Sequence, residues 1–555
     1  MATAVKRWDQ EADVVVVGSG GAALPAAILA HDNGAKVLVI ERSDKVGGTT
    51  ALSGGAAWIP LNHHMEKAGI KDSREAALTY CKLLTAGRAP DEMVETFVDT
   101  APQMLRYMEE HCHVKFNVIA DLPDYQPEKE GGCKGGRTLD AELFDSKGLG
   151  EWASKLRKGP AAMFPVTIAE AMGSKYKMAV HVKNAPVELI MERMGQGLLA
   201  TGPSLAGQLL KACLDRGVTI LLETRGRELI MEDGRIVGLR AEREGKDLFV
   251  KAPAVVLACG GFEWNKELLN KFLPGPIGGT CSPPHCNEGD GLIMAMEVGA
   301  DLANMTEGWL SPGAVIPGQE SEGEPVWSLV FTDRSVPHTI TVNRYGERFV
   351  NESANYNDMG KAFWYFDPVA YDYRNIPSWL IIDSQYRQKY PIMSSIMPDY
   401  PDPEWLTKDD TLAGLARKVG IDPQGLEATV ARWNGFVREG KDRDFHRGES
   451  AYDRAWFADP EAPHPNLGTI EKPPFYTFPI ELGFMGGTNG GPRTNTKGQV
   501  LNVRGRVIPG LYAAGNTAAS PCGPAYWGGG ATISTAMTFG YICGINAAKE
   551  AKRGA

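Results

Sequence analysis

Residues 13–60, which decide the fold, read DVVVVGSGGAALPAAILAHDNGAKVLVIERSDKVGGTTALSGGAAWIP. Val14–Val17 form a short apolar run that suits a strand buried on both faces of a parallel sheet. A G-x-G-x-x-A turn follows, made of Gly18, Ser19, Gly20, Gly21, Ala22 and Ala23. The first glycine of such a turn permits the tight bend, the second lets the backbone approach a pyrophosphate, and the small last residue allows close helix packing. We expect the next helix to aim its free N–H groups at that pyrophosphate.

A second apolar run, 36–40, ends in Glu41, at the spacing from the turn where an acid accepts hydrogen bonds from a ribose. These elements predict a βαβ dinucleotide-binding unit. Arg42 and the glycine- and hydroxyl-rich stretch 46–55 then offer donors for a diphosphate and for ring oxygens. Two such loops favour the longer FAD over NAD. The cofactor residues predicted here are Glu41, Arg42, Gly48, Thr49, Thr50, Ser53, Gly54 and Gly55.

Two stretches carry a resemblance to a known family. GGTTALSGGAAWIP (47–60) and GNTAASPCGPAYWGGGATISTAMTFGY (515–541) resemble the flavoproteins grouped with fumarate reductase, most closely the 3-ketosteroid dehydrogenases. The resemblance covers nearly the whole chain and is strongest over 13–60, 340–356 and 486–541. It implies an α/β fold with a Rossmann-like FAD-binding domain, an inserted α+β substrate domain and non-covalently bound FAD. Further cofactor residues that it implies are Gly226, Ala258, Gly260, Asp290, Gly515, Asn516, Ala531, Thr532 and Ile533.

The expected order is a first FAD-binding segment over 1–308, a substrate domain over 309–481 and a second FAD-binding segment over 482–555. Residues 341–350 are expected to form a hairpin that turns at Tyr345-Gly346. Residues 152–183 interleave basic and apolar side chains, which suits a lid or a membrane-surface segment. The alternative for 152–183 is a solvated helix pair that covers the domain.

Composition excludes several functions. A net charge of −10 and a pI near 5.6 argue against a nucleic-acid binder, which usually has a basic face. The nine cysteines are scattered without a CxxC pair, as expected for free thiols in a reducing compartment. Because the first strand begins too early for a signal peptide, we expect a cytoplasmic protein. No metal site is predicted, since His63-His64 and His111-x-His113 lack a carboxylate or cysteine partner at ligand spacing.

Desaturation of a ketone requires a base for the α-proton, a flavin for the β-hydride and donors for the carbonyl oxygen. Tyr526 lies beside the second flavin loop and, with the N–H of Gly530, is predicted to hold the carbonyl oxygen. The resemblance implies that Tyr356 is the base, acting as a tyrosinate. A phenol with a pKa near 10 is a poor base at neutral pH. Tyr125 is therefore predicted to donate to Tyr356 and lower its pKa.

The function expected from the resemblance is Δ1-dehydrogenation of a 3-ketosteroid, in which the tyrosinate takes the C2 proton and flavin N5 takes the C1 hydride. The insertion suggests sterols with a long side chain, and a separate electron acceptor of unspecified identity reoxidises the flavin. Three alternatives stay open at this point. They are a dehydrogenase of a small cyclohexanone-like ketone, a fumarate-reductase-like enzyme, and a flavin subunit that only relays electrons. The second needs an arginine clamp, and the sequence from Asn351-Glu352 reaches Tyr356 but no arginine before Arg374.

Overall fold

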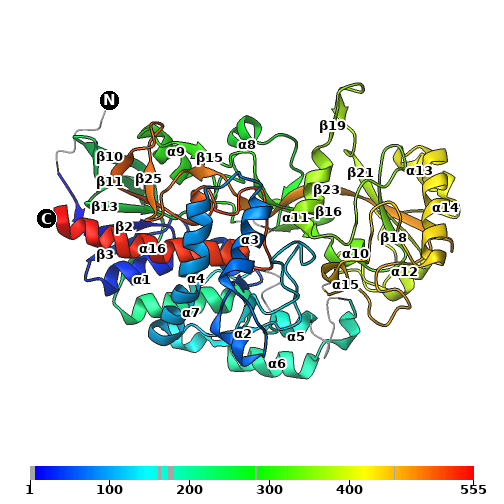
Figure 1. The fold of residues 1–555 in the computed structure, drawn as a ribbon, viewed down its shortest axis with the longest axis horizontal. Coiled ribbons are helices and arrows are strands. Elements are labelled where there is room, and N and C mark those ends of the chain that lie inside the picture. The colour runs from blue at the N-terminus through cyan, green and yellow to red at the C-terminus, as the bar shows by residue number, and fades with distance from the viewer. Residues whose placement is uncertain are drawn as a thin grey trace.

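The structure is a computed structural model that describes residues 7–159, 164–172, 180–281, 284–321, 323–455 and 457–554. Figure 1 shows an elongated molecule. A parallel sheet lies at the end that carries both chain termini, and a largely antiparallel sheet lies toward the other end. Strands β16 and β23 belong to this second sheet.

The first sheet has the strand order β25-β26-β13-β2-β3-β9. Its strands are β25 (Gln499–Leu501), β26 (Val507–Ala513), β13 (Ala254–Leu257), β2 (Val14–Val17), β3 (Val37–Ile40) and β9 (Thr219–Leu221). All neighbouring strands are parallel except β25 and β26. Val14 and Val16 pack into the core on one face, and Val15 and Val17 pack into the core on the other. The prediction of a strand buried on both faces is confirmed.

Different layers cover the two faces of this sheet. On one face, α1 (Ala23–Asp32) packs against the long C-terminal helix α16 (Ala531–Gly554), with α4 (Asp91–Cys112) and α7 (Thr201–Asp215) outside them. On the other face lies a four-stranded sheet of order β1-β12-β11-β10. Its strands are β1 (Gln10–Glu11), β12 (Lys246–Lys251), β11 (Arg235–Arg243) and β10 (Thr224–Glu232). This arrangement of a parallel sheet between layers confirms the Rossmann-like fold.

The second large sheet has the order β17-β16-β23-β21-β18, with β14 and β22 also paired to β23. Its strands are β14 (Gly279–Thr280), β16 (Gly308–Ser321), β17 (Glu324–Leu329), β18 (Thr339–Asn343), β21 (Ser378–Asp383), β22 (Thr407–Asp409) and β23 (Phe475–Thr488). Helices α13 (Leu412–Val419) and α14 (Pro423–Glu439) supply Leu415, Leu426 and Trp433 to the core on one face.

Two expectations from the sequence concern residues of this second sheet. The turn at Gly346 forms, with its N–H donating to Asn343 O at 2.9 Å. The predicted hairpin is wrong, however, because residues 347–350 form no strand and β18 pairs with β21 instead. Long-range pairing therefore overrides the local hairpin signal. The domain boundaries stay a prediction, and the one at 481/482 falls inside β23.

The remaining elements surround these sheets. The other strands are β4 (Ala57–Trp58), β5 (Phe116–Val118), β6 (Thr138–Ala141), β7 (Phe144–Asp145), β8 (Leu198–Leu199), β15 (Leu302–Ala303), β19 (Phe366–Asp367), β20 (Asp372–Tyr373) and β24 (Gly491–Pro492). The other helices are α2 (His63–Lys67), α3 (Arg74–Thr85), α5 (Ile168–Met172), α6 (Val187–Gln196), α8 (Lys266–Phe272), α9 (Asp290–Glu297), α10 (Phe331–Ser335), α11 (Tyr356–Lys361), α12 (Ser384–Lys389) and α15 (Ala451–Ala455). No helix within the described ranges has the length and apolarity that a membrane crossing requires.

A buried network of ion pairs holds the segment between β18 and α11. Arg348 binds Glu352 at 2.6 Å and Asp442 at 2.9 Å, and these three side chains are at most 3% exposed. Arg447 also contacts Glu352, at 3.3 Å. Removing one partner from a buried ion pair leaves an uncompensated charge, which costs far more than losing an exposed pair.

We predict that Arg348→Met lowers the free energy of unfolding by about 3–5 kcal/mol. Arg438→Met is the matched control, because Arg438 pairs with Glu471 on the surface and its side chain is 64% exposed. That control should cost at most about 1 kcal/mol. Urea unfolding of both variants measures the difference. Equal stability of the two variants would contradict the importance of the network.

Candidate active site

The first glycine turn forms a cradle with one closed side and one open side. Gly18 has a φ of +107°, and a Cβ placed on it would lie 2.3 Å from the carbonyl oxygen of Ala258. A Cβ on Gly20 would meet its nearest protein atoms only at 3.9 Å. Gly18 is therefore required by the fold itself, whereas Gly20 leaves free space in front of the backbone. This open side fits the close approach of a pyrophosphate.

The acid expected to bind the ribose lies where β3 ends. Glu41 is 8% exposed and accepts hydrogen bonds from Ser19 Oγ at 2.5 Å and from Ser43 N at 2.8 Å. Burial raises the pKa of Glu41, and these hydrogen bonds oppose the rise. A carboxylate has about four lone-pair sites, so it retains acceptor capacity for ribose hydroxyls. Glu41 also lines the cavity, so its placement fits the ribose of a dinucleotide.

A single large cavity starts at this cradle, with a volume of about 1890 Å³ that includes its opening to solvent. The predicted residues that line it are Gly18, Ser19, Gly20, Gly21, Ala22, Glu41, Arg42, Gly48, Thr49, Thr50, Ser53, Gly54, Gly55, Tyr125, Gly226, Ala258, Gly260, Asp290, Tyr356, Gly515, Asn516, Tyr526, Gly530, Thr532 and Ile533. Ala23 and Ala531 do not line it, because they are buried at the start of α1 and α16. The lining joins the glycine cradle to the three tyrosines, which fits a cofactor and a substrate in one cavity.

Several lining residues carried no local sequence signal. At the apolar end are Leu52, Ile168, Leu329, Phe331 and Met485. These side chains come from four separate segments, so only the tertiary structure brings them together. At the polar end, Asn287 donates to Thr49 Oγ1 at 3.2 Å and to Glu263 at 2.7 Å. Asn287 was within reach of sequence reasoning, since it lies in the same NEGDG stretch that marked Asp290.

Three tyrosines from distant parts of the chain meet at the apolar end. The ring centres of Tyr125 and Tyr356 lie 5.3 Å apart, those of Tyr125 and Tyr526 5.0 Å, and those of Tyr356 and Tyr526 5.6 Å. The hydroxyls of Tyr125 and Tyr356 share a short hydrogen bond. Tyr452 adds a fourth phenol, 5.0 Å from Tyr125, which the sequence did not indicate. We call Tyr125, Tyr356, Tyr452 and Tyr526 the tyrosine cluster.

Ionic anchors hold Tyr125 in this position. The neighbouring carboxylate of Asp124 accepts hydrogen bonds from Trp58 Nε1 at 2.7 Å and from Arg137 Nη1 at 2.8 Å. Burial raises the pKa of Asp124 to about 6, although Arg137 and Trp58 lower it. The backbone N–H of Tyr125 donates to Trp527 O at 3.1 Å. This last bond ties the Tyr125 loop to the loop that carries Tyr526.

The cluster does not by itself produce an acidic phenol. Burial raises the pKa of Tyr356 well above 10, and the neighbouring phenols raise it further. Either hydroxyl of this pair can donate the hydrogen bond that joins Tyr125 and Tyr356, so donation from Tyr125 stays a prediction. Burial also raises the pKa of Tyr526, and hydrogen bonds from Thr532, Tyr356 and the Gly530 backbone oppose that rise. The cluster therefore fixes the relative positions of the phenols, and a phenolate at Tyr356 needs a positive charge nearby.

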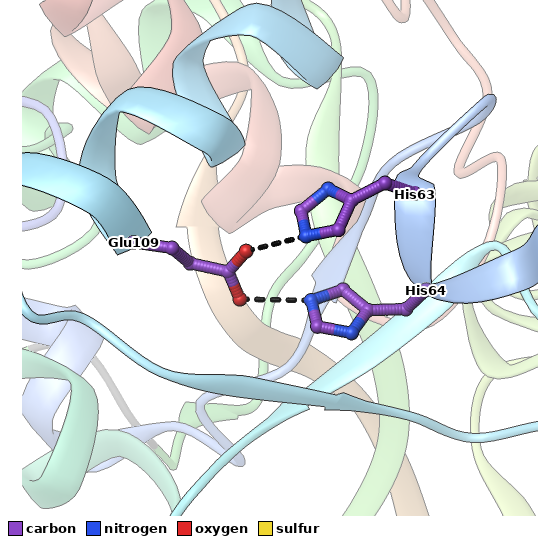
Figure 2. A group of neighbouring side chains, drawn as sticks. All are labelled: His63, His64 and Glu109. Carbon is purple, nitrogen blue, oxygen red and sulfur yellow. Dashed lines mark hydrogen bonds and ion pairs between the residues drawn. The ribbon is translucent and has the colours of Figure 1, made fainter. Parts of the chain in front are cut away.

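A second group of titratable side chains lies outside the cavity. Figure 2 shows His63 and His64 on α2, with each ring turned toward a different oxygen of Glu109 on α4. Both Nε2–O distances are 2.8 Å, and the three ligand-type atoms lie within 4.8 Å of one another. This carboxylate carries no local sequence signal, because Glu109 is 45 residues from His64. The positive charges of Arg106 and Lys67 act on His63. The group therefore links α2 to α4 through the two contacts with Glu109.

We predict that Gly20→Ala folds but binds FAD at least tenfold more weakly, which is a loss of about 1.4 kcal/mol of binding free energy. The added methyl group meets no protein atom closer than 3.9 Å, yet it occupies the side left open for the pyrophosphate. Gly435→Ala is the control, because a Cβ on this α14 glycine has no neighbour within 4 Å. Flavin retained after gel filtration, and titration of apoprotein with FAD, measure the effect. Wild-type affinity in Gly20→Ala would overturn the assignment of the cradle.

Comparison with known proteins identifies the family of this chain. Residues 13–533 match the family described as FAD binding domain, which confirms the cofactor. A 3-oxosteroid 1-dehydrogenase of Mycobacterium tuberculosis is 35% identical, over 98% of this chain and 99% of its own length. A 4-oxocyclohexanecarboxylate 2-dehydrogenase of Sinomonas cyclohexanicum is 38% identical, over 97% and 93%. The crystal structure of 3-ketosteroid delta1-dehydrogenase from Sterolibacterium denitrificans with 1,4-androstadiene-3,17-dione is 35% identical, covers 97% and 100%, and superposes with a TM-score of 0.88. The chain therefore belongs to the FAD-binding flavoprotein family that includes the 3-ketosteroid dehydrogenases.

Proposed function

We propose that this protein is an FAD-dependent dehydrogenase that introduces a C1–C2 double bond into a 3-ketosteroid. The observation that supports this most directly is the meeting of Tyr125, Tyr356 and Tyr526 at the apolar end of the FAD cavity. The family relationship and the 0.88 superposition on a steroid dehydrogenase support the same reading.

FAD and the residues of the chain have separate roles in this reaction. When bound, FAD supplies the two-electron acceptor that takes the C1 hydride. The Tyr356 phenolate takes the C2 proton, and the electron pair left on C2 forms the C1–C2 double bond as C1 loses its hydride. Tyr526 Oη and the Gly530 N–H hold the C3 carbonyl oxygen, where negative charge develops. Tyr125 positions the Tyr356 hydroxyl through their shared hydrogen bond.

Residues of the chain also supply the binding surfaces. The glycine cradle at Gly18–Gly21 and the carboxylate of Glu41 hold the dinucleotide. The N-terminus of α16, which begins directly after Gly530, carries partial positive charge toward the cavity. Leu329, Phe331 and Met485 give the remaining wall an apolar surface that suits a flat steroid ring system and excludes water.

A small cyclic ketone is the second candidate substrate, because the 38% identical relative is named for 4-oxocyclohexanecarboxylate. The same tyrosines serve that chemistry. A carboxylate substituent calls for a cationic partner. Within the described residues, however, the cations that line the cavity are Arg42, Lys45 and Arg157, near the nucleotide cradle. Arg157 donates to Ser43 Oγ at 2.6 Å, and Lys45 donates to Ser154 O at 3.0 Å, so both cations are held beside the segment that follows Glu41. This distribution favours the uncharged steroid, and it also disfavours a fumarate-like dicarboxylate.

Peripheral membrane contact and a cytoplasmic location complete the proposal. Val187, Met191 and Met194 follow one another along α6 with 64%, 63% and 48% of their surface exposed, and Phe164 nearby is 54% exposed. In the same region, Ile168 lines the cavity. An apolar helix face beside the cavity suits transfer of a sterol from a lipid surface. Of the predicted insertion 152–183, residues 160–163 and 173–179 lie outside the described residues. The nine cysteines are free, as in proteins of reducing compartments.

We predict that Tyr356→Phe abolishes reduction of the bound flavin by a 3-ketosteroid while FAD stays bound. Phenylalanine keeps the packing of the ring but removes the only proton acceptor that Tyr356 offers. Anaerobic mixing of the yellow holoenzyme with 3-ketosteroids, and with 4-oxocyclohexanecarboxylate, followed at the flavin absorbance, measures the effect. Wild-type reduction that occurs only with the small carboxylate would replace the steroid by the second candidate. Reduction of the variant at the wild-type rate would remove Tyr356 as the base.

The membrane contact predicts a separate result with vesicles. A variant with Val187, Met191 and Met194 changed to Ser should bind anionic phospholipid vesicles at least tenfold more weakly than the wild type in a sedimentation assay. A variant with Val369 and Tyr371 changed to Ser is the control, because these side chains are 95% and 83% exposed outside α6. Loss of vesicle binding in the α6 variant alone supports the proposal. Equal binding by both variants, or none by the wild type, refutes the contact and leaves the reaction unaffected.

A further inference from the structure

Helix α10 buries an arginine beside the tyrosine cluster. The Arg334 side chain is 0% exposed. Its Nη1 donates to the carbonyl oxygen of Glu352 and, at 2.8 Å, to that of Ala354. These two carbonyls belong to the segment that leads directly into α11, and Tyr356 is the first residue of that helix. Arg334 therefore holds the backbone that places Tyr356.

The charge of Arg334 has no ion-pair partner within 4.0 Å in the described ranges, where its Nε also makes no hydrogen bond. Neighbouring arginines differ in this respect. Arg348 and Arg447 bind Glu352 at 2.6 and 3.3 Å. A buried cation without a paired anion is costly, so its retention calls for an explanation beyond packing.

Arg334 lies close to an aromatic ring that packs on the tyrosine cluster. Its Cζ lies 6.0 Å from the centre of the Phe331 ring. Phe331 in turn stacks on Tyr356, with ring centres 4.9 Å apart and an angle of 28° between the planes. Tyr356 and Tyr452 are both among the groups that act electrostatically on Arg334. A full charge in a dry interior is felt over such distances because the local dielectric constant is low.

The anions near Arg334 already interact with other groups; Asp333, whose carboxylate feels the charge of Arg334, accepts from Met393 N at 2.8 Å. The charge of Glu352 is met by Arg348 and Arg447. Asp453 accepts hydrogen bonds from Asn351 at 2.9 Å and from Gly448 N at 2.8 Å, and burial raises its pKa. Arg334 thus has capacity for an anion that is present only during turnover.

The other groups described here beside Tyr356 are neutral phenols and a phenyl ring. Tyr125 comes from the loop after β5, Tyr452 from α15 and Tyr526 from the loop before α16, and all three act on Tyr356 as phenols. Phe331 covers the ring from α10. A neutral phenol donates one hydrogen bond but brings no net charge. Arg334 is a cation beside this cluster, and its charge opposes the rise in the pKa of Tyr452 that burial causes.

We propose that Arg334 is a positioning residue that stabilises the phenolate form of Tyr356. It does so in two ways, by fixing the segment 352–354 before Tyr356 and by providing the positive charge that this phenolate meets. The inference rests on the proposed function, because a base at Tyr356 is what requires such a charge.

The test compares Arg334→Met, which removes the charge, with Arg334→Lys, which keeps the charge but loses the planar fork. The measurement is the pH dependence of flavin reduction by a 3-ketosteroid in single-turnover mixing of the holoenzyme. We expect Arg334→Met to be more than tenfold slower at pH 7, to move the rising limb of the profile up by at least one pH unit and to approach the wild-type rate at high pH. Arg334→Lys should restore most of the wild-type pH profile.

Asp333→Asn is the matched control on the same helix. Asp333 is 1% exposed and accepts from Tyr386 Oη at 3.3 Å and Met393 N at 2.8 Å, away from the tyrosine cluster. Its profile should keep the wild-type position. A uniform loss of rate at every pH in Arg334→Met, or no shift in its profile, would overturn the proposal, since a structural effect alone gives the former.

A second readout does not depend on turnover. The tyrosinate absorbance of wild type minus that of Tyr356→Phe gives the ionisation of Tyr356, which should move to higher pH in an Arg334→Met background. An unchanged titration would refute the role of Arg334. If wild-type flavin is not reduced by any 3-ketosteroid, the proposed function fails, and this titration still decides the inference. Where Arg334→Met gives no folded holoenzyme, Arg334→Gln takes its place in both measurements.

Discussion

The parallel register of β2, β3, β13 and β26 is the constraint on which the site depends. Parallel strands end at the same edge of a sheet, and the residues after all four strands line the cavity. They are Gly18 after β2, Glu41 after β3, Ala258 after β13, and Gly515 with Asn516 after β26. A loss of that register would disperse the cradle, because it sets where these four segments end, and contacts such as Ser19 Oγ to Glu41 depend on it. The ligand then lies at the carboxyl ends of the strands, as is general for open α/β sheets.

The second sheet contributes a different property to the same cavity. Its β17 and the following α10 carry Leu329 and Phe331, and β23 carries Met485. These side chains make one end of the cavity apolar while the cradle end is polar. The contrast matters because a phenol in an apolar environment resists ionisation. A buried tyrosine base therefore requires both a shaped apolar surface for its substrate and a compensating charge behind it.

Buried charge is the means by which the chain fixes the reacting residues. Arg137 with Asp124 fixes the Tyr125 loop, and Arg348 with Glu352 fixes the segment before Tyr356. Each network lies behind a tyrosine and does not line the cavity itself. Such networks are less a source of net stability than of defined geometry, which is a role attested for buried polar groups in some proteins. The tyrosines can then be apolar on the side that faces the substrate.

Sequence alone determined the dinucleotide cradle, because strand, turn, helix and acid follow one another within 13–60 and their conformations are local. The glycine positions and the burial of Val14–Val17 on both faces are consequences of backbone sterics and hydrophobic pattern. Tertiary structure decided the rest. It placed Tyr125, Tyr356 and Tyr526 together, paired β18 with β21 in place of the expected hairpin, and brought Glu109 to His63 and His64. These contacts join segments separated by tens to hundreds of residues, and only the packing of whole sheets and helices sets such distances.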